Sequence, residues 1–431
     1  MKRFFIVLLS VSFASSYLYA EKINREIVKM QTLKNNPLIT IAKLKLDNAQ
    51  QEYNDSLSVF FPTIAFKGQT GQSEQYSSNR GSDGKIYSFR TDTRFSFCEL
   101  TASLQVFSGF VTSNNLKSKV AKIKFAQAEY DKIVSSVVYT SDLAYINLMW
   151  AYERVELLKE IKERRVENKD IVKLQYNSGK ADMASLKIVE ADVAVVECNL
   201  KQAQRRIKVA SMFLLNAIGR NDDATILEVD EKLVSFEELI QKPDYNNLIT
   251  TIPEFLQKQY QFDIYKAEMS KTKGEYLLPK LDLFGTISPY NKKSISGETI
   301  STSDKQVFLQ LSYSFFTGGK IRAAIKMALN NIAIASEELK KEVNSLKTQA
   351  VQHYTNIIDS YELTKANIQS LNALKLQAEM ASIQYINGLI NYSDWYRIGN
   401  DYINLQIKNL DDKKNLAEFK AKWLNFMGKG F

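Results

Sequence analysis

The stretch Gln175-Tyr176-Asn177-Ser178-Gly179 recurs 209 residues later as Gln384-Tyr385-Ile386-Asn387-Gly388 (179 to 388). Each copy lies inside a long run without proline, rich in Ala, Leu, Lys, Glu and Gln, and the two runs cover 111–219 and 320–428. As a helix, the roughly 65 residues before the first glycine would be about 100 Å long. A helix of that length must pack along its side against other helices. Each glycine then marks the turn between two paired helices.

Two further matches have the same offset of 209 residues. Phe107-Ser108-Gly109 corresponds to Phe316-Thr317-Gly318, and the end of the first run, Leu215–Gly219, corresponds to Leu424–Gly428. Three matches without an insertion indicate a duplicated structural unit. We therefore expect two structural repeats, 21–220 and 252–431, each with a helix, a β-hairpin and a long helix pair. A connector over 221–251 would fold against the outside of the helices.

The N-terminus has the pattern of a secretory signal peptide. Lys2 and Arg3 precede an apolar run from Phe4 to Phe13, and Ala20 suits the residue before the cleavage site. We exclude residues 1–20 from the fold for that reason. No later apolar stretch approaches 18 residues, so we expect no membrane-spanning helix in the mature chain.

Two segments alternate between apolar and polar residues with the period of a β-strand, and each doubles back through polar residues. The first hairpin is predicted over about 59–107, with a polar tip over 68–88, and the second over about 278–316, with a loop over 291–303. The residues 21–57 before the first hairpin are read as a helix interrupted near Pro37. Each chain would thus contribute four strands. The predicted strand–helix joints are Pro62, Phe107, Gly109, Pro279, Phe316 and Gly318.

Four strands cannot close a barrel by themselves. Strands with one polar face, one lipid-compatible face and polar tips fit an outer-membrane barrel to which several chains contribute. Two chains would supply eight strands and a filled interior, whereas three would supply twelve and leave a lumen. Tyr76, Tyr87 and Tyr290, near the hairpin tips, are candidate residues of an aromatic girdle at the membrane interface.

Taken together, these features resemble the TolC-like outer membrane efflux protein family. The likeness rests on the signal peptide, the two-fold repeat, the aromatic-x-Gly joints, the Tyr-x-x-Gly turns and the Leu-Asn-x-x-Gly repeat ends. It implies a mainly α fold with a β membrane part, in which a homotrimer forms a 12-stranded barrel in outer-membrane lipid and a long α-helical tunnel through the periplasm of a Gram-negative bacterium. It also implies a role as the exit duct of a tripartite efflux pump, with a periplasmic adaptor and an inner-membrane RND, MFS or ABC transporter as partners.

The resemblance also assigns roles to residues near the two turns. Tyr176, Gly179, Tyr385 and Gly388, with Asp182 beside the first turn, would form the tunnel gate and the adaptor-docking turns. Family members carry carboxylates after the second turn that ring the constriction. Asp394 matches one of them, but Arg397 stands where the family has a second aspartate. Three Asp394 side chains would attract cations, whereas Arg397 could neutralise them, and a solvated or capping role for Asp394 remains the alternative.

Other functions find little support in the sequence. A net charge of +9 is spread over mixed Lys/Glu segments, which does not favour nucleic-acid binding. There is no phosphate-binding loop or metal-ligand pattern, and the single histidine, His353, is expected to pack between helices. We therefore expect no enzyme activity and no cofactor. The alternatives are the exit duct of a type I protein secretion system and a structural coiled-coil envelope protein without a pore; a passive porin would need far more strand.

Overall fold

A computed structural model describes residues 21–221, 227–233, 242–294 and 299–428. The predicted signal peptide lies outside the described residues. The chain forms two compact units. Of the described residues, unit 1 comprises those within 21–42, 130–253 and 345–428, and unit 2 those within 43–129 and 254–344. The units cut across the two repeats because each repeat contributes residues to both; the division at 21–220 and 252–431 stays a prediction.

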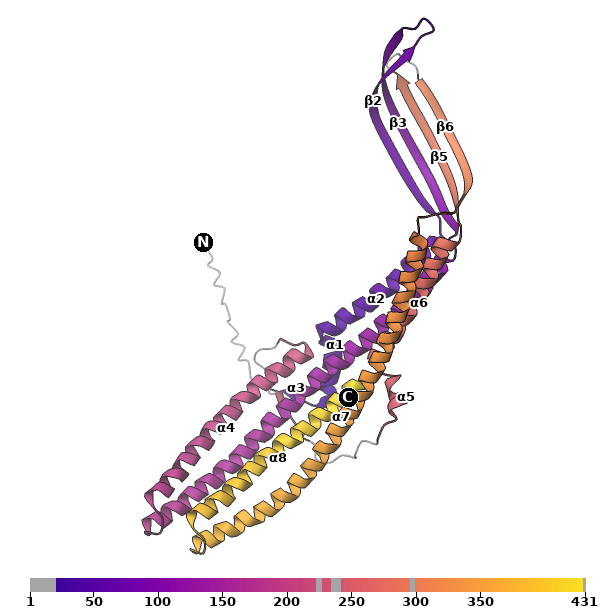
Figure 1. Cartoon of the computed structure of the whole chain (residues 1–431). Coiled ribbons are helices and arrows are strands. Elements are labelled where there is room, and N and C mark those ends of the chain that lie inside the picture. The colour runs from indigo at the N-terminus through magenta and orange to yellow at the C-terminus, as the bar shows by residue number, and fades with distance from the viewer. Residues whose placement is uncertain (1–20, 222–226, 234–241, 295–298, 429–431) are drawn as a thin grey trace, which may run out of the picture. The chain divides into compact units, whose positions relative to one another are not determined.

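Two helix pairs account for most of the described chain. The first consists of α3 (Val111–Asn177) and α4 (Met183–Ile218), and the second of α7 (Lys320–Ile386) and α8 (Tyr392–Phe426). Both α3 and α7 contain 67 residues, and α7 begins and ends 209 residues after α3 (111 to 320, 177 to 386). In Figure 1, α4 lies beside α3 and α8 beside α7. The predicted helix pairs are therefore confirmed.

Shorter helices lead into each hairpin. In the first repeat these are α1 (Arg25–Asn35) and α2 (Pro37–Leu57), followed by a single 3₁₀ turn, η1 (Ser58–Phe60). Before the second hairpin they are α5 (Tyr245–Ile249), which lies in the connector, and α6 (Pro253–Leu277). The break between α1 and α2 occurs at Asn36, as expected, because proline disfavours helical conformation in the residue before it.

Two short strands were not foreseen. β1 (Glu21–Ile23) pairs in parallel with β4 (Leu227–Val229), which lies in the connector. The interpretation of residues 21–57 as helix from its first residue is therefore wrong, and these two short strands are additional to the four predicted hairpin strands. Three-residue strands show no usable alternation in the sequence, and this pair forms because the tertiary fold brings its two segments together. Arg220 binds Glu21 at 2.9 Å beside it.

The remaining strands form one antiparallel sheet in unit 2. These are β2 (Thr63–Arg80), β3 (Ile86–Phe107), β5 (Lys280–Ser294) and β6 (Thr299–Ser312), in the order β2-β3-β5-β6. The strands run further than predicted: β2 and β3 continue through the expected polar tip and leave a turn of only five residues, 81–85. β6 ends at Ser312, four residues before the predicted joint at Phe316.

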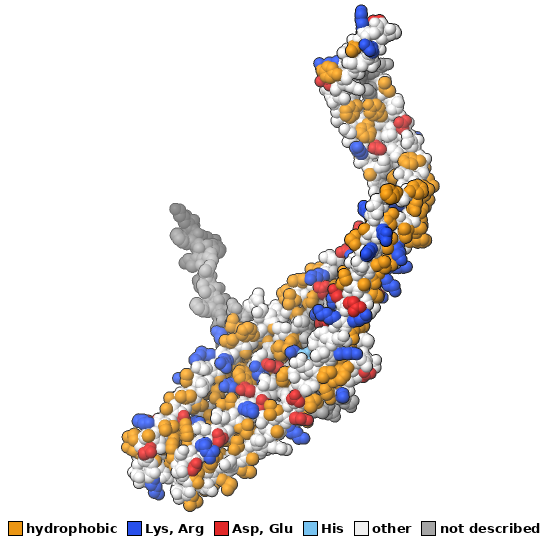
Figure 2. Space-filling view, in the orientation of Figure 1, with side chains coloured by type: hydrophobic (Ala, Val, Ile, Leu, Met, Phe, Trp, Pro, Cys, Tyr) orange, Lys and Arg blue, Asp and Glu red, His pale blue; other side chains and the backbone are white. Residues whose placement is uncertain are grey.

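The sheet register separates a mainly apolar face from a mainly polar face, although Lys305 is opposite Ile287 on the first and Phe284 is opposite Phe308 on the second. On the apolar face, Phe66 is opposite Leu100 and Leu100 is opposite Ile287, and the next row along contains Ala102 and Val307. The polar face carries Lys67 opposite Glu99, Thr101 opposite Thr286 and Asp282 opposite Gln310. Figure 2 shows hydrophobic side chains reaching the surface over these strands. The alternation predicted from the sequence is confirmed, and no layer formed by the described residues covers the apolar face of the sheet in unit 2.

The tyrosines proposed as a girdle do not share one face. Register places Tyr87 opposite Asn79 and Tyr290 opposite Phe97, both on the polar face. Tyr76 is on the apolar face but ten residues beyond Phe66, which is about 33 Å along the strand. A girdle formed by these three residues is therefore not supported. The sequence suggested proximity to the tips but not which way each side chain faces.

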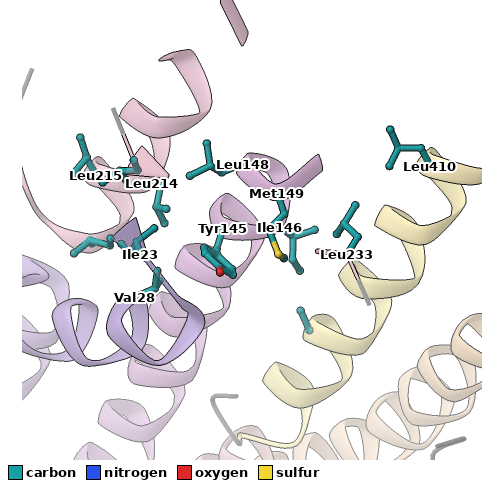
Figure 3. Close-up of a cluster of buried hydrophobic side chains, with 13 residues drawn as sticks. Ile23, Val28, Tyr145, Ile146, Leu148, Met149, Leu214, Leu215, Leu233 and Leu410 are labelled. Atoms are coloured by element: carbon teal, nitrogen blue, oxygen red, sulfur yellow. The ribbon is translucent and has the colours of Figure 1, made fainter. Parts of the chain in front are cut away.

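The hydrophobic core of unit 1 lies along the middle of α3. Tyr145, Ile146 and Leu148 are fully buried and pack with residues of the other elements around α3. Figure 3 shows them within a cluster that also contains side chains from α1, α4, α8 and the β1 segment. Arg25 binds the fully buried Asp142 through two hydrogen bonds of 2.8 and 2.7 Å and so anchors α1 to α3. None of the described helices has a stretch both long and apolar enough to cross a membrane.

Candidate functional site

The turn after α3 is a Schellman motif. The amide of Gly179 donates to the carbonyl of Tyr176 at 2.9 Å, and the amide of Lys180 donates to that of Gln175 at 2.8 Å. Gly179 has a φ of +72°, a left-handed conformation that favours glycine. The last carbonyls of α3 are thereby satisfied, and the chain can reverse into α4.

The turn after α7 repeats this geometry. Gly388 has a φ of +75°, its amide donates to Tyr385 at 3.0 Å, and Leu389 donates to Gln384 at 2.8 Å. The two turns lie next to each other, because the side-chain amide of Gln175 donates to the carbonyl of Ile386 at 3.4 Å. We call the α3–α4 turn with its flanking residues the first tip, and the α7–α8 turn the second tip.

Each second helix begins with a side chain that caps its N-terminus. Asp182 accepts the amide of Ser185 at 2.6 Å, and Asn391, which occupies the same repeat position (182 to 391), accepts the amide of Asp394 at 2.8 Å. The hydrogen bond from the Ser185 amide lowers the pKa of Asp182. Asp182 therefore has a structural role as an N-cap at the first tip.

An aromatic cluster supports the second tip. Trp395 is buried, lies parallel to Tyr385 at a ring distance of 4.4 Å, and donates its indole N–H to Ser382 at 3.1 Å. Tyr392 packs beside both rings, and burial raises the pKa of its phenol. Its hydroxyl oxygen is buried without a hydrogen-bond partner among the described residues. The same cluster includes Val172 and residues of α4, so it joins the two tips.

Arg165 of α3 links three helices above the turns. Its guanidinium forms an ion pair with Asp192 of α4 at 3.0 Å and donates to Asn400 of α8. It also lies over the ring of Tyr396 at 5.8 Å. The side chain of Arg165 is largely buried, and a buried charge that loses its partners is strongly destabilising. Arg165 therefore stabilises the packing of the first helix pair against the second.

Asp394 and Arg397 lie on the exposed side of the second tip. Asn391 donates its side-chain N–H to Asp394 at 2.9 Å, so Asp394 takes part in the cap. Arg397 approaches Asp394 at 4.0 Å and Asp401 at 3.5 Å. The arginine therefore has a carboxylate on either side within one chain, an arrangement that offsets rather than concentrates negative charge.

The first strand–helix joint is closely packed. Gly109 has a φ of +66°, and a Cβ at this position would lie 2.5 Å from the carbonyl oxygen of Gly274 in α6. Phe107 and Phe110 pack edge to face at 5.4 Å. Glycine is required here for its conformation and for the close approach of two backbones.

The second joint has the glycines but not the packing. Gly318 and Gly319 have φ values of +59° and +86°, yet nothing surrounds their Cβ positions within 4 Å. Pro62 and Pro279 each directly precede a strand, β2 and β5 respectively. A proline there costs the sheet no hydrogen bond and separates helix from strand.

No group of His, Cys, Asp or Glu among the described residues has the arrangement of a metal site. His353 packs against the ring of Phe426 at 5.2 Å, and burial lowers its pKa. The expected packing role of this histidine agrees with these contacts.

Sequence reasoning gave no specific contacts to several residues of the tips and of the first joint. In the sequence, Trp395 and Tyr396 are an aromatic pair beside the second turn, Arg165 is one cation among many, and Gly274 of the first joint has no counterpart at the 209-residue offset. A Tyr-Ser-Asp-Trp-Tyr sequence directly after the Gly388 turn was the available signal, since aromatic residues at helical spacing next to a turn often pack across it.

A family model of outer membrane efflux proteins matches residues 29–220 and 270–417, which is most of the chain. The chain belongs to the outer membrane efflux protein family. Its members are channel-type proteins of the outer membrane, which confirms the resemblance inferred from the repeats. No curated protein matches the chain.

Solved structures of outer-membrane channels share this fold. CusC covers 96% of this chain and 96% of its own, with a TM-score of 0.80 and 14% sequence identity. The outer membrane protein VceC from Vibrio cholerae covers 94% and 96%, with a TM-score of 0.75 and 16% identity. The open-state MtrE outer membrane channel of Neisseria gonorrhoeae covers 94% and 89%, with a TM-score of 0.75 and 15% identity. At these identities, the likeness shows a common fold.

Proposed function

We propose that three copies of the chain form an outer-membrane channel that serves as the exit duct of a tripartite efflux pump. The single observation that carries this proposal is the four-stranded sheet with an uncovered apolar face and two unpaired edges, β2 and β6. An exposed apolar sheet with open edges is an aggregation hazard in water. Lipid on that face and a neighbouring copy on each edge remove the hazard, and three copies supply twelve strands.

The helical part supports the same assembly. α4 exposes Val195, Val209 and Phe213, and α7 exposes Leu376, Met380 and Ile383. An uncovered apolar stripe on a long helix favours a further helix as its neighbour. Between copies, α4 of one chain would then pack beside α7 of the next and close a tunnel of twelve long helices.

In this proposal the two tips close the periplasmic end of the tunnel and receive the adaptor. Their construction supports that role, because an aromatic cluster and Arg165 hold the two turns together as one module. A periplasmic adaptor and an inner-membrane RND, MFS or ABC transporter would complete the pump, and the transporter would supply the energy.

The decisive experiment is reconstitution of the full-length protein. Purified in detergent, it should migrate as a heat-dissociable trimer, and in planar lipid bilayers it should give discrete conductance steps. A chain that stays monomeric in water, with no affinity for lipid and no conductance, would refute the channel. Reconstitution with adaptor and transporter, followed by measurement of vectorial export, would test the pump.

The gate is tested with substitutions at the second tip. Asp394→Ala or Arg397→Ala should raise the single-channel conductance, because each removes a group that narrows the closed end. Glu362→Ala, which removes an exposed carboxylate of α7 about 37 Å from the turn, is the control. Unchanged conductance and unchanged cation block in both tip variants would exclude these two residues from the gate.

A further inference from the structure

The two strand–helix joints differ in what surrounds them. The first joint, from β3 to α3, packs against the end of α6, where Gly109 meets the carbonyl oxygen of Gly274. Since α6 leads into β5, the first joint contacts the helix end that precedes the next hairpin of the sheet. This contact lies beneath the pairing of β3 with β5.

At the second joint, no described residue comes within 4 Å of a Cβ placed on Gly318 or Gly319. This joint follows β6, the edge strand of the sheet, and contains Phe315 and Phe316, which are 90% and 88% exposed. Gly318 and Gly319 have open space around them, although their φ values are positive, as that of Gly109 is. The two glycines would therefore allow another backbone to pack closely against this joint, as Gly274 packs against Gly109 at the first joint.

The other edge strand of the sheet is β2, and it is the element before this strand that is left uncovered. η1 and the residues after it lead into β2 as α6 leads into β5, and because β2 is an edge strand, no described strand of this chain follows on its outer side. Phe60 and Phe61 at this end are 54% and 69% exposed. Among the described residues, the second joint thus has no helix end beside it at the β6 edge, and η1 has no joint on its outer side at the β2 edge.

We propose that the second joint of one copy closes on η1 of a second copy, with Phe315 and Phe316 packed against Phe60 and Phe61 of that copy. The contact between the first joint and α6 is the intrachain example of the same arrangement. Burial of four phenyl rings favours the association, and ring pairs contribute beyond their buried area. This inference rests on the proposed trimer and identifies a contact between neighbouring copies at the level where the strands meet the helices.

The positions along the strands are compatible with this contact. In the register that aligns Thr63 with Phe308 through Ser103 and Phe284, Phe61 is level with Gln310. Phe315 lies five residues further along the chain (310 to 315), which is at most about 17 Å. In a barrel whose strands tilt by roughly 40°, residues at the same height on β2 and β6 are displaced along the strand direction by about 12 Å, because three interstrand spacings separate the two strands. The two offsets are of the same order.

Disulfide cross-linking tests the contact directly. With Cys98 and Cys198 replaced by serine, the double variant Phe61→Cys/Phe316→Cys is oxidised in the full-length, detergent-purified protein. Most of the chains should become part of covalent dimers and trimers. The control pair Phe61→Cys/Phe89→Cys, whose second cysteine lies on β3 away from the joints, should not cross-link. A trimer that forms without cross-links in the test pair would overturn the contact and leave the channel standing.

A double-mutant cycle gives a second readout. Phe61→Ala and Phe316→Ala should each lower the dissociation temperature of the trimer, and the double variant should lose less than the sum of the two. Phe89→Ala should leave that temperature unchanged. Strictly additive losses would overturn the contact, as would quenching of a Phe316→Trp variant by brominated acyl chains in the trimer, since that ring would then face lipid. A protein that never forms oligomers contradicts the proposed trimer itself.

Discussion

The first and second tips have the same backbone turn but different side-chain support. Their glycines adopt φ values of +72° and +75°, and both turns close with the same pair of hydrogen bonds. In the first tip, α4 begins with Met183 and Leu186, whereas the same positions of α8 are Tyr392 and Trp395 (183 to 392, 186 to 395). Duplication has thus preserved the turn, while the second tip acquired an aromatic core that stiffens it and joins the two.

The largest expected effect comes from removing that core. Trp395→Ala deletes a buried indole and its stacking on Tyr385, which costs about 3–5 kcal/mol of local stability. Hydrogen exchange of the tip amides should show the second tip opening first. Leu186→Ala is the matched change in the first tip and should loosen that turn more than the other. Equal loosening of both turns by Trp395→Ala would show that the tips unfold as one unit.

The turn glycines should behave alike in the two tips. Gly179→Ala and Gly388→Ala each force an alanine into a left-handed conformation, at a cost of about 1–2 kcal/mol. Gly399→Ala is the control, since Gly399 lies inside α8 without a positive φ and with no neighbour within 4 Å. That change should stabilise α8 by up to about 1 kcal/mol. In thermal denaturation, the melting temperature should fall for Gly179→Ala and Gly388→Ala and rise for Gly399→Ala.

The caps should differ in their response to acid. The pKa of Asp182 is lowered in the folded state by the amide of Ser185, so its contribution is present above the unfolded pKa and is lost as pH falls through the folded pKa. Asn391 does not titrate. Exchange of the Ser185 amide should therefore accelerate in acid relative to that of Asp394. Asp182→Asn should abolish this pH dependence, and its persistence in that variant would assign the effect to another group.

Arg397→Ala should have the smallest effect on stability. Its side chain is largely exposed and its two carboxylate partners are on the same helix, so the loss should not exceed about 1 kcal/mol. The same denaturation assay measures it. A loss well above this value would mean that Arg397 has a buried partner in the assembled channel.

Much of the fold was predictable because its signals are periodic and repeated. A glycine at the same repeat position in both halves, long proline-free runs and strict alternation in the strands identified the helix pairs and the sheet. The β1–β4 pair was not predictable, since three residues carry no period. The extent of β2 and β3 was underestimated because Gly, Ser and Asn are usual in loops, although a long ladder of cross-strand hydrogen bonds accommodates them here.

The sequence by itself determined the duplicated architecture of this protein: where each helix turns and which strand positions are apolar. Only the tertiary structure decided which residues meet: that Trp395 stacks on Tyr385, that Arg165 ties three helices together, and that Gly109 has a backbone neighbour while Gly318 has none. The physical reason is range. Turns and faces depend on residues a few positions apart within one element, whereas these contacts depend on how separate elements come to lie together: Tyr385 and Trp395 belong to α7 and α8, and Gly109 meets Gly274 of α6.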